Sequence, residues 1–276
     1  MRFAHMSPVR RSSRTLAVMN SQLTWLRAKL FDSPQDVTGF HYEPLDRASQ
    51  FAEAAPGLTV GTFRDAPPWI VVDLSLAKTI VASWPGRLWE VQIINQASEQ
   101  PVASAGYIRA TAVRVVRELP SAMLFGASGE AVASILSVAA QLTMDQRDQL
   151  ARMHNEAGDD AYSQAWNRWL IESDPTSVYY GDDHRNTLAI STGEERSPLG
   201  SAFTVLCTVL SRRAAEIDDA AAFVDDGEER YFSPIWAKVF ASLLHACMAI
   251  GADVSLIPRN QRSVLRAAYD SLTAIK

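Results

Sequence analysis

The order of apolar and polar positions divides the chain into a β-rich part and a helical part. Between residues 58 and 126, apolar residues occur in short runs rich in β-branched and aromatic side chains, and Gly, Pro or charged residues bound each run. Such runs are typical of strands. After Gly126 the apolar positions recur every three or four residues, which predicts helices. The pattern predicts an α+β fold, with a mainly antiparallel sheet of about five strands in the N-terminal half packed against a helical C-terminal half.

Five segments are expected to form the sheet. The residue types of Pro85-Gly86 are those of a type II turn, so we expect a hairpin around it. The last segment fits a helix by its spacing, but its β-branched content and the position of Leu119 before Pro120 favour a strand. The expected strands are Leu58–Val60, Trp69–Leu74, Thr79–Trp84, Leu88–Ile94 and Tyr107–Leu119.

Helices are expected on both sides of these strands. In the second half, Thr143-x-x-Gln146 has the residues of a capping box, and Ser-Pro pairs supply an N-cap followed by Pro at the first helical position. We expect helices at 15–31, at 45–55, at Glu130–Leu142, from Thr143 to about His154, from Asp159 or Asp160 to Asp174, after Ser197-Pro198, from Ser233-Pro234 to Gly251, and after Asn260. We predict that the chain divides into residues 1–126, with the N-terminal helices and the sheet, and the helical residues 127–276. A single domain also fits the pattern.

Composition indicates a soluble protein. Of the 276 residues, 47% are hydrophobic and 21% are charged, which excludes a disordered or fibrous chain. The most apolar run, Ile235–Ile250, contains Lys238 and is shorter than the roughly 20 residues of a membrane helix. No signal peptide is visible, and Cys207 and Cys247 fall within helical patterns as buried thiols. We therefore expect a cytoplasmic protein, and the 22 arginines against 4 lysines suggest a bacterial or phage genome.

The N-terminus differs from the rest in charge. Residues 1–31 contain six basic residues and no acidic one, so a net charge of −5 leaves −11 for the remainder. A basic arm on an acidic body could touch nucleic acid or an anionic membrane. The simpler interpretation is a terminal extension, with Met1, Met6 or Met19 as the true start. An acidic body repels phosphates, so we expect no nucleic acid contact apart from this arm and no membrane contact.

Ser128 and Glu130 are the first candidate catalytic residues. The segment Gly126-Ala-Ser128-Gly-Glu130 lies between a strand-like segment and a helix, as in a nucleophile elbow. In that turn a small residue occupies the position of Glu130. The segment could also bind a phosphate at the start of the helix, although it lacks the lysine of a P-loop. A turn in which Ser128 caps the helix explains it more simply.

The densest set of metal-ligating residue types forms the second candidate. His154 and Glu156 are followed by Asp159 and Asp160, and then by Asp182, Asp183 and His184. Two imidazoles with carboxylates suit a mixed nitrogen and oxygen site for a divalent metal. The ligand set that we predict is His154, Asp182, Asp183 and His184. The competing explanation is structural. Aspartates suit helix caps and turns, and a helix dipole stabilises a cationic imidazole at His154.

Three other features have simpler explanations. The acidic stretch 216–229 lacks the order of a calcium loop and suits a solvated helix end, although it could bind a basic partner. His245 falls opposite the bulky stripe of its helix and is expected to be partly exposed. The tryptophans, including Trp69, Trp84 and Trp89, are expected in the core, with a sugar-binding wall as the alternative.

Three classes of function fit this sequence, and no complete catalytic motif decides among them. We favour a cytosolic bacterial or phage interaction or regulatory protein without catalytic activity, such as an accessory, inhibitor or toxin-neutralising factor, whose partner is another protein. The alternative is a metal-dependent hydrolase that uses a His/Asp cluster. Nucleic acid binding through the basic arm is the third.

Overall fold

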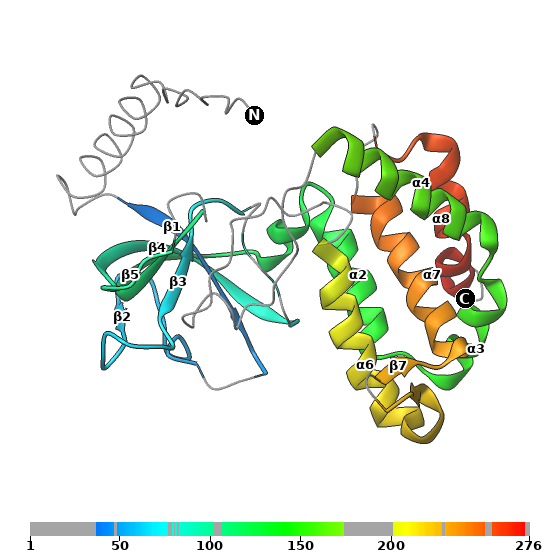
Figure 1. Cartoon of the computed structure of the whole chain (residues 1–276), viewed down its shortest axis with the longest axis horizontal. Coiled ribbons are helices and arrows are strands. Elements are labelled where there is room, and N and C mark those ends of the chain that lie inside the picture. The colour runs from blue at the N-terminus through cyan, green and yellow to red at the C-terminus, as the bar shows by residue number, and fades with distance from the viewer. Residues whose placement is uncertain are drawn as a thin grey trace, which may run out of the picture. The chain divides into compact units, whose positions relative to one another are not determined.

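The fold is α+β, and the five strands of the main sheet precede the described α-helices (Figure 1). The computed structural model describes residues 37–46, 49–76, 79, 81, 83–101, 106–173, 201–227, 230–251 and 256–273. A five-stranded antiparallel sheet occupies residues 38–119, and the helices lie mostly between residues 129 and 273. The predicted fold class is confirmed. The expected helix at 15–31 falls outside the described residues.

The sheet closes on itself through its two longest strands. Its order is β2-β5-β3-β1-β4, and β4 also pairs with β5, so that β5, β3, β1 and β4 form a ring. Register shifts between Glu90 and Val91 and near Asn95 let these strands bend around it. The strands are β1 (Thr38–Pro44), β2 (Thr59–Gly61), β3 (Ile70–Asp73), β4 (Gly86–Gln96) and β5 (Tyr107–Leu119).

The sheet confirms four predicted strands and corrects one. The segment Tyr107–Leu119 is a strand, as expected. The predicted hairpin around Pro85-Gly86 is wrong, because β4 pairs with β1 and β5, and the described residues between 79 and 85 form no strand. Their backbone groups are used elsewhere. The hydroxyl of Tyr42 donates to the carbonyl of Ser83 at 2.7 Å, and the amide of Leu45 donates to that of Pro85 at 3.0 Å.

The expected short helix at 45–55 is also wrong. Its described residues form turns, in which the amide of Ala54 donates to the carbonyl of Phe51 across three residues. Phe51 is 2% exposed and stacks on His41, with ring centroids 4.2 Å apart. The segment therefore contributes Phe51 to the core against the sheet. Its apolar positions do not mark the inward face of a helix.

The helical part begins with a 3-10 turn and contains six described α-helices. Two predicted helix starts are confirmed: Thr143 and Gln146 form the expected capping box, and Pro234 opens its helix after Ser233. A two-stranded ribbon, β6 (Phe223–Asp225) with β7 (Arg230–Phe232), joins two of the helices. The elements are η3 (Ser121–Phe125), α2 (Gly129–Ala140), α3 (Met144–Met153), α4 (Glu156–Ser173), α6 (Ser201–Ala222), α7 (Pro234–Gly251) and α8 (Arg259–Thr273).

Helix α7 is the centre of the helical part, where α2, α3, α4, α6 and α8 contact it. Trp236 and Leu243 are fully buried on it. By length and composition α7 could cross a membrane, but 56% of it is buried inside the protein, as in the core helix of a soluble protein. On α6, Leu206 and Leu210 are buried, while Phe203 is 44% exposed.

The described residues from Thr38 onward belong to one compact unit. Tyr42 and Leu88 of the sheet share a core cluster with residues of the helices. Arg212 of α6 donates to the carboxylate of Asp46 and to the Ser83 hydroxyl. The division near residue 126 stays a prediction.

Candidate metal centre

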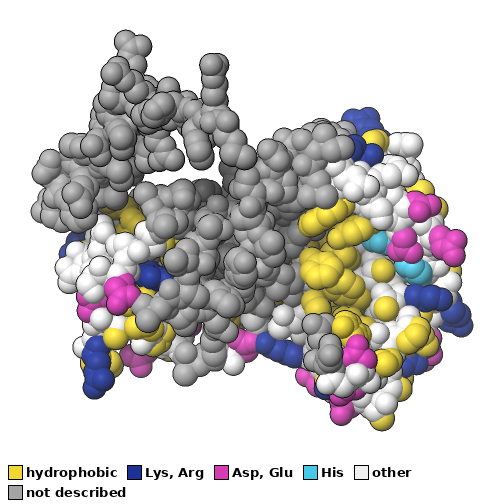
Figure 2. Space-filling model, in the orientation of Figure 1, with side chains coloured by type: hydrophobic (Ala, Val, Ile, Leu, Met, Phe, Trp, Pro, Cys, Tyr) yellow, Lys and Arg dark blue, Asp and Glu magenta, His cyan; other side chains and the backbone are white. Residues whose placement is uncertain are grey.

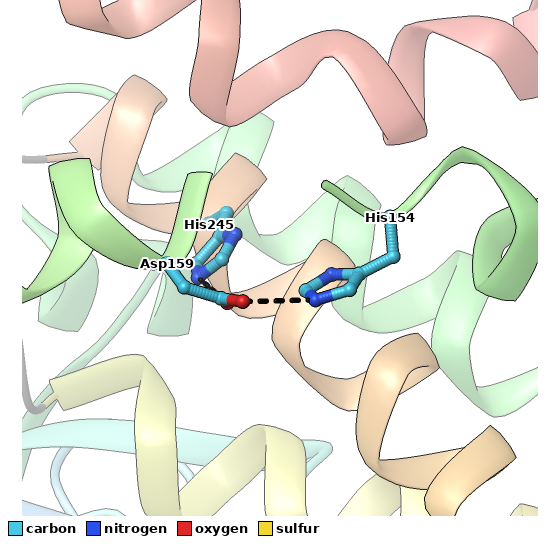
Figure 3. Close-up of side chains that lie close together, drawn as sticks. All are labelled: His154, Asp159 and His245. Carbon is cyan, nitrogen blue, oxygen red and sulfur yellow. Dashed lines mark hydrogen bonds and ion pairs between the residues drawn. The ribbon is translucent and has the colours of Figure 1, made fainter. Parts of the chain in front are cut away.

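Three helices bring two histidines and one aspartate together (Figure 3). His154 is the residue that follows α3, Asp159 lies in the first turn of α4, and His245 lies in the middle of α7. The link between α3 and α4 is two residues long, so the end of one helix faces the start of the next. Asn155 fixes that start, because its side-chain oxygen accepts the amide of Gly158 at 2.9 Å.

The carboxylate of Asp159 lies between the two imidazoles. Its Oδ2 is 3.0 Å from Nε2 of His154, and its Oδ1 is 3.5 Å from Nε2 of His245. The ring centroids of the two histidines are 6.0 Å apart. One ligand atom from each residue lies within 4.8 Å of the other two. Each ring therefore directs its own Nε2 atom at the carboxylate of Asp159.

The cluster is buried on the histidine side and open on the aspartate side. The side chains of His154 and His245 are 11% and 6% exposed, whereas that of Asp159 is 47% exposed. Figure 2 shows histidine side chains beside acidic ones on the surface of the helical part.

Burial keeps His245 uncharged at neutral pH. Desolvation lowers its pKa from 6.5 to about 4; the charge of Asp159 opposes this shift, and His154 adds to it. A neutral imidazole has a free lone pair on one nitrogen, which is the form that binds metal ions.

Gly158 makes the space that His245 occupies. A β-carbon at this position would lie 2.9 Å from Nδ1 of His245, closer than real contacts allow. The ring of Tyr162, one turn further along α4, packs against His245 with centroids 5.5 Å apart. The His245 ring is thus enclosed by α4, with its Nε2 directed at Asp159.

The donor atoms suit a divalent transition metal. Ligand atoms at about 2.1 Å from a zinc ion stand roughly 3.4 Å apart in a tetrahedron. The nitrogen–oxygen distances are close to this value, 3.0 Å from His154 to Oδ2 and 3.5 Å from His245 to Oδ1 of Asp159, of which one oxygen would serve as the ligand. The widest gap, at most 4.8 Å, must close by up to about 1.4 Å, which side-chain rotation can supply. Three protein ligands leave a position for water or substrate, as in catalytic zinc sites.

The predicted ligand set is only partly represented in this cluster. His154 belongs to it, whereas Asp182, Asp183 and His184 lie outside the described residues, so their role stays a prediction. Asp159 was expected as a helix cap, but α4 begins three residues earlier at Glu156. The expectation of partial exposure for His245 is wrong, since it is 5% exposed. On α7, His245 lies on the side opposite the bulky apolar stripe. Helix α4 packs against that side of α7 and buries the residue.

Ser128 and Glu130 occupy the turn that begins α2. Ser128 is the N-cap residue, but its side chain makes no capping hydrogen bond, and its carbonyl accepts the amide of Ala131 at 3.0 Å. Gly129 packs so closely on Ala122 that a β-carbon would collide with its carbonyl. Glu130 is exposed in the first turn. The segment is positioned by backbone packing, and its catalytic role stays untested.

The acidic stretch pairs with arginines. Asp219 pairs with Arg230 at 2.9 Å, and Glu216 pairs with Arg213 at 3.0 Å. Asp218 accepts from Arg147 and, at 2.9 Å, from the indole of Trp236. These contacts involve Glu216, Asp218 and Asp219, and the carboxylate of Asp225 accepts the amide of Gly227 at 2.8 Å.

The two cysteines are free thiols on helices α6 and α7. Cys247 is buried, as expected, and burial raises its pKa to about 12. Cys207 is only partly buried, and desolvation raises its pKa as well. Neither thiol is activated as a nucleophile.

Comparison of the chain with models of protein families, with curated proteins and with solved structures found no match. The functional argument therefore rests on the geometry of the cluster.

Proposed function

We propose that this protein is a metal-dependent hydrolase whose divalent ion is held by His154, Asp159 and His245. The observation that supports this proposal is the convergence of their three ligand atoms within 4.8 Å. The proposed site joins His154 to Asp159 and His245, leaves the predicted Asp182, Asp183 and His184 untested outside the described residues, and keeps the reaction class that the His/Asp clustering suggested. Zinc is the first ion to test, and manganese the second.

The ligands and their surroundings match what a catalytic ion needs. Two neutral nitrogens and one carboxylate leave one net positive charge on a divalent ion, which increases the acidity of a bound water. The exposed side of Asp159 gives water and substrate access, while the buried rings hold the ion on the protein side. The chain would thus supply three fixed ligands and one free position.

The test is metal binding by the full chain without a histidine tag. Wild-type protein stripped with a chelator should bind one zinc ion per chain by calorimetry and should show a rise in melting temperature with zinc concentration. The variants H154A and D159N should lose most of this affinity, since each removes one of three ligands. Hydrolysis of generic ester and phosphoester substrates, with and without zinc, then tests the reaction class.

The chain offers a matched control in the next residue. Asp160 is exposed on the same turn of α4 and is not part of the cluster, so D160N should bind zinc as the wild type does. Equal losses in D159N and D160N would mean that nonspecific charge attraction holds the ion. Absence of binding by the wild type would contradict the proposal, and a proton shared between His154 and Asp159 would then explain the cluster.

The second candidate is a cytosolic bacterial or phage regulatory protein that acts by binding another protein without catalysis. It is supported by a row of phenylalanines on the helical part. Phe203 is 44% exposed and packs edge-on against Phe240 at 5.1 Å, and Phe232 and Phe223 continue the row. Figure 2 shows hydrophobic side chains gathered on the surface of this part.

Metal content separates the two candidates. Less than about 0.2 zinc or manganese per chain, with no stabilisation by either ion, favours the regulatory protein. One ion per chain favours the hydrolase. Nucleic acid contact by the basic arm is a separate proposal, because the arm lies outside the described residues; deletion of residues 1–18 should then abolish any salt-sensitive binding to DNA.

A further inference from the structure

Ser242 connects α7 to the buried side of His154. Its hydroxyl oxygen lies 3.4 Å from Nδ1 of His154 and 3.4 Å from the carbonyl oxygen of Leu150. The residue is 1% exposed. Both contacts are long for hydrogen bonds, but the hydroxyl lies between a ring nitrogen and a carbonyl, and it can rotate to donate to either.

We infer that Ser242 is a positioning residue that stabilises whichever tautomer of His154 the site requires. This inference rests on the proposed function. Nε2 of His154 faces the Asp159 carboxylate at 3.0 Å, and a carboxylate only accepts. In the metal-free protein the neutral ring therefore carries its proton on Nε2, and the Ser242 hydroxyl donates to the bare Nδ1.

An ion at the cluster reverses this arrangement. The ion needs the lone pair of Nε2, so that nitrogen releases its proton to solvent and Nδ1 takes one up. The new N–H donates to the oxygen of Ser242, whose own proton then points to the carbonyl of Leu150. That carbonyl already accepts the amide of His154 at 2.9 Å and has a second lone pair. One hydroxyl thus satisfies Nδ1 of a largely buried ring in both states.

The tautomers can be observed directly by long-range proton–nitrogen NMR spectra of the full chain, at a pH where the ring is neutral. We expect the His154 proton on Nε2 in the metal-free protein and on Nδ1 in the zinc-saturated protein. Zinc bound to Nδ1, or a metal-free protein with the proton already on Nδ1, would overturn the inference.

The variant S242A removes the hydroxyl and leaves the helix intact. It should lower zinc affinity by about 10-fold or more, the usual effect of losing a group that orients a metal ligand. In the metal-free ring it should shift the Nδ1 resonance, which loses its hydrogen-bond donor, while Asp159 still holds the proton on Nε2. The control S137A deletes an exposed hydroxyl that bonds to its own helix at the carbonyl of Ala133, and it should change neither measurement.

The outcomes for Ser242 are separable from those for the metal site. If the wild type binds no zinc, the proposed function fails, but the metal-free Nδ1 resonances of wild type and S242A still test the contact. If the wild type binds zinc and S242A binds it equally well, the role of Ser242 fails and the metal site stands.

Discussion

The sheet and the helical part arrange their ionisable side chains differently. On the sheet, Arg87 pairs with Glu118 at 2.8 Å and Arg117 with Glu90 at 2.6 Å, each between β4 and β5. In the helical cluster, two imidazoles share the single carboxylate of Asp159. The sheet pairs join one positive charge to one negative charge. In the cluster, the lone pairs of two ring nitrogens face the lone pairs of one carboxylate.

This difference shows where chemistry can occur. A matched surface pair is complete and is screened by solvent, so it has little further capacity to bind an ion. A carboxylate between two ring nitrogens needs a proton or a metal ion between them, because lone pairs that face one another repel. The comparison predicts effects on stability and binding that differ in size and in sign between the two regions.

The largest effect is expected from acid. In the metal-free protein the pKa of His245 is lowered from 6.5 to about 4, so the unfolded chain binds more protons than the folded one between these pH values. The free energy of unfolding therefore falls as pH drops through this window, by about 3 kcal/mol, and His245 contributes no further change below it. Urea unfolding of chelated wild type and H245L across this range measures the difference.

The variant H245L removes the titrating group, so its stability should depend less on pH between 6.5 and 4. The carboxylates titrate in both proteins, and the difference between the two curves isolates the histidine. Parallel curves would mean that the ring is protonated at little cost, and that burial does not keep it neutral.

A smaller effect is expected at Gly158, where two contributions to the free energy of unfolding oppose each other. Alanine is favoured over glycine within a helix by about 1 kcal/mol. Here the new β-carbon would lie 2.9 Å from Nδ1 of His245, and overpacking typically costs about 1–3 kcal/mol. We expect G158A to lower the free energy of unfolding by about 1 kcal/mol and to weaken zinc binding.

A double variant tests the cause. In the H245A background the ring is gone, so adding G158A should stabilise the protein by up to about 1 kcal/mol. A destabilising G158A in both backgrounds would place the collision elsewhere. Chemical denaturation of the four proteins completes the cycle.

The smallest effect is expected on the sheet. Arg87 donates two hydrogen bonds to Glu118 and lowers the pKa of that carboxyl, but the side chains are 31% and 46% exposed. E118Q should change the free energy of unfolding by less than about 1 kcal/mol and should leave zinc binding unchanged. A loss of zinc affinity in E118Q would remove the contrast between the two regions.

Local patterns determined much of the fold. Thr143 and Gln146 mark the start of α3, because their hydrogen bonds involve only neighbouring residues. The β-branched segment Tyr107–Leu119 forms the long strand β5 for a similar reason, as its side chains suit a pleated surface whatever pairs with it. The apolar stripe of α7 likewise predicted the core helix.

Pairing between distant segments was not determined locally. The strand β1 and the failed hairpin at Pro85 depend on contacts between residues about 40 positions apart, such as Tyr42 with Ser83. Periodicity identifies a strand but not its neighbour, so an apolar run such as Thr79–Trp84 can be mistaken for one.

The sequence by itself determined that His154 lies at the end of a helix with acidic residues close behind it, because capping and helical spacing are local properties. Only the tertiary structure decided that His245, 91 positions away, completes the cluster. A helix shows from its own pattern which side is bulky, but not which neighbouring helix covers the other side. Packing of α4 on α7, with Gly158 against the ring, turned a helix position expected at the surface into a buried member of the cluster.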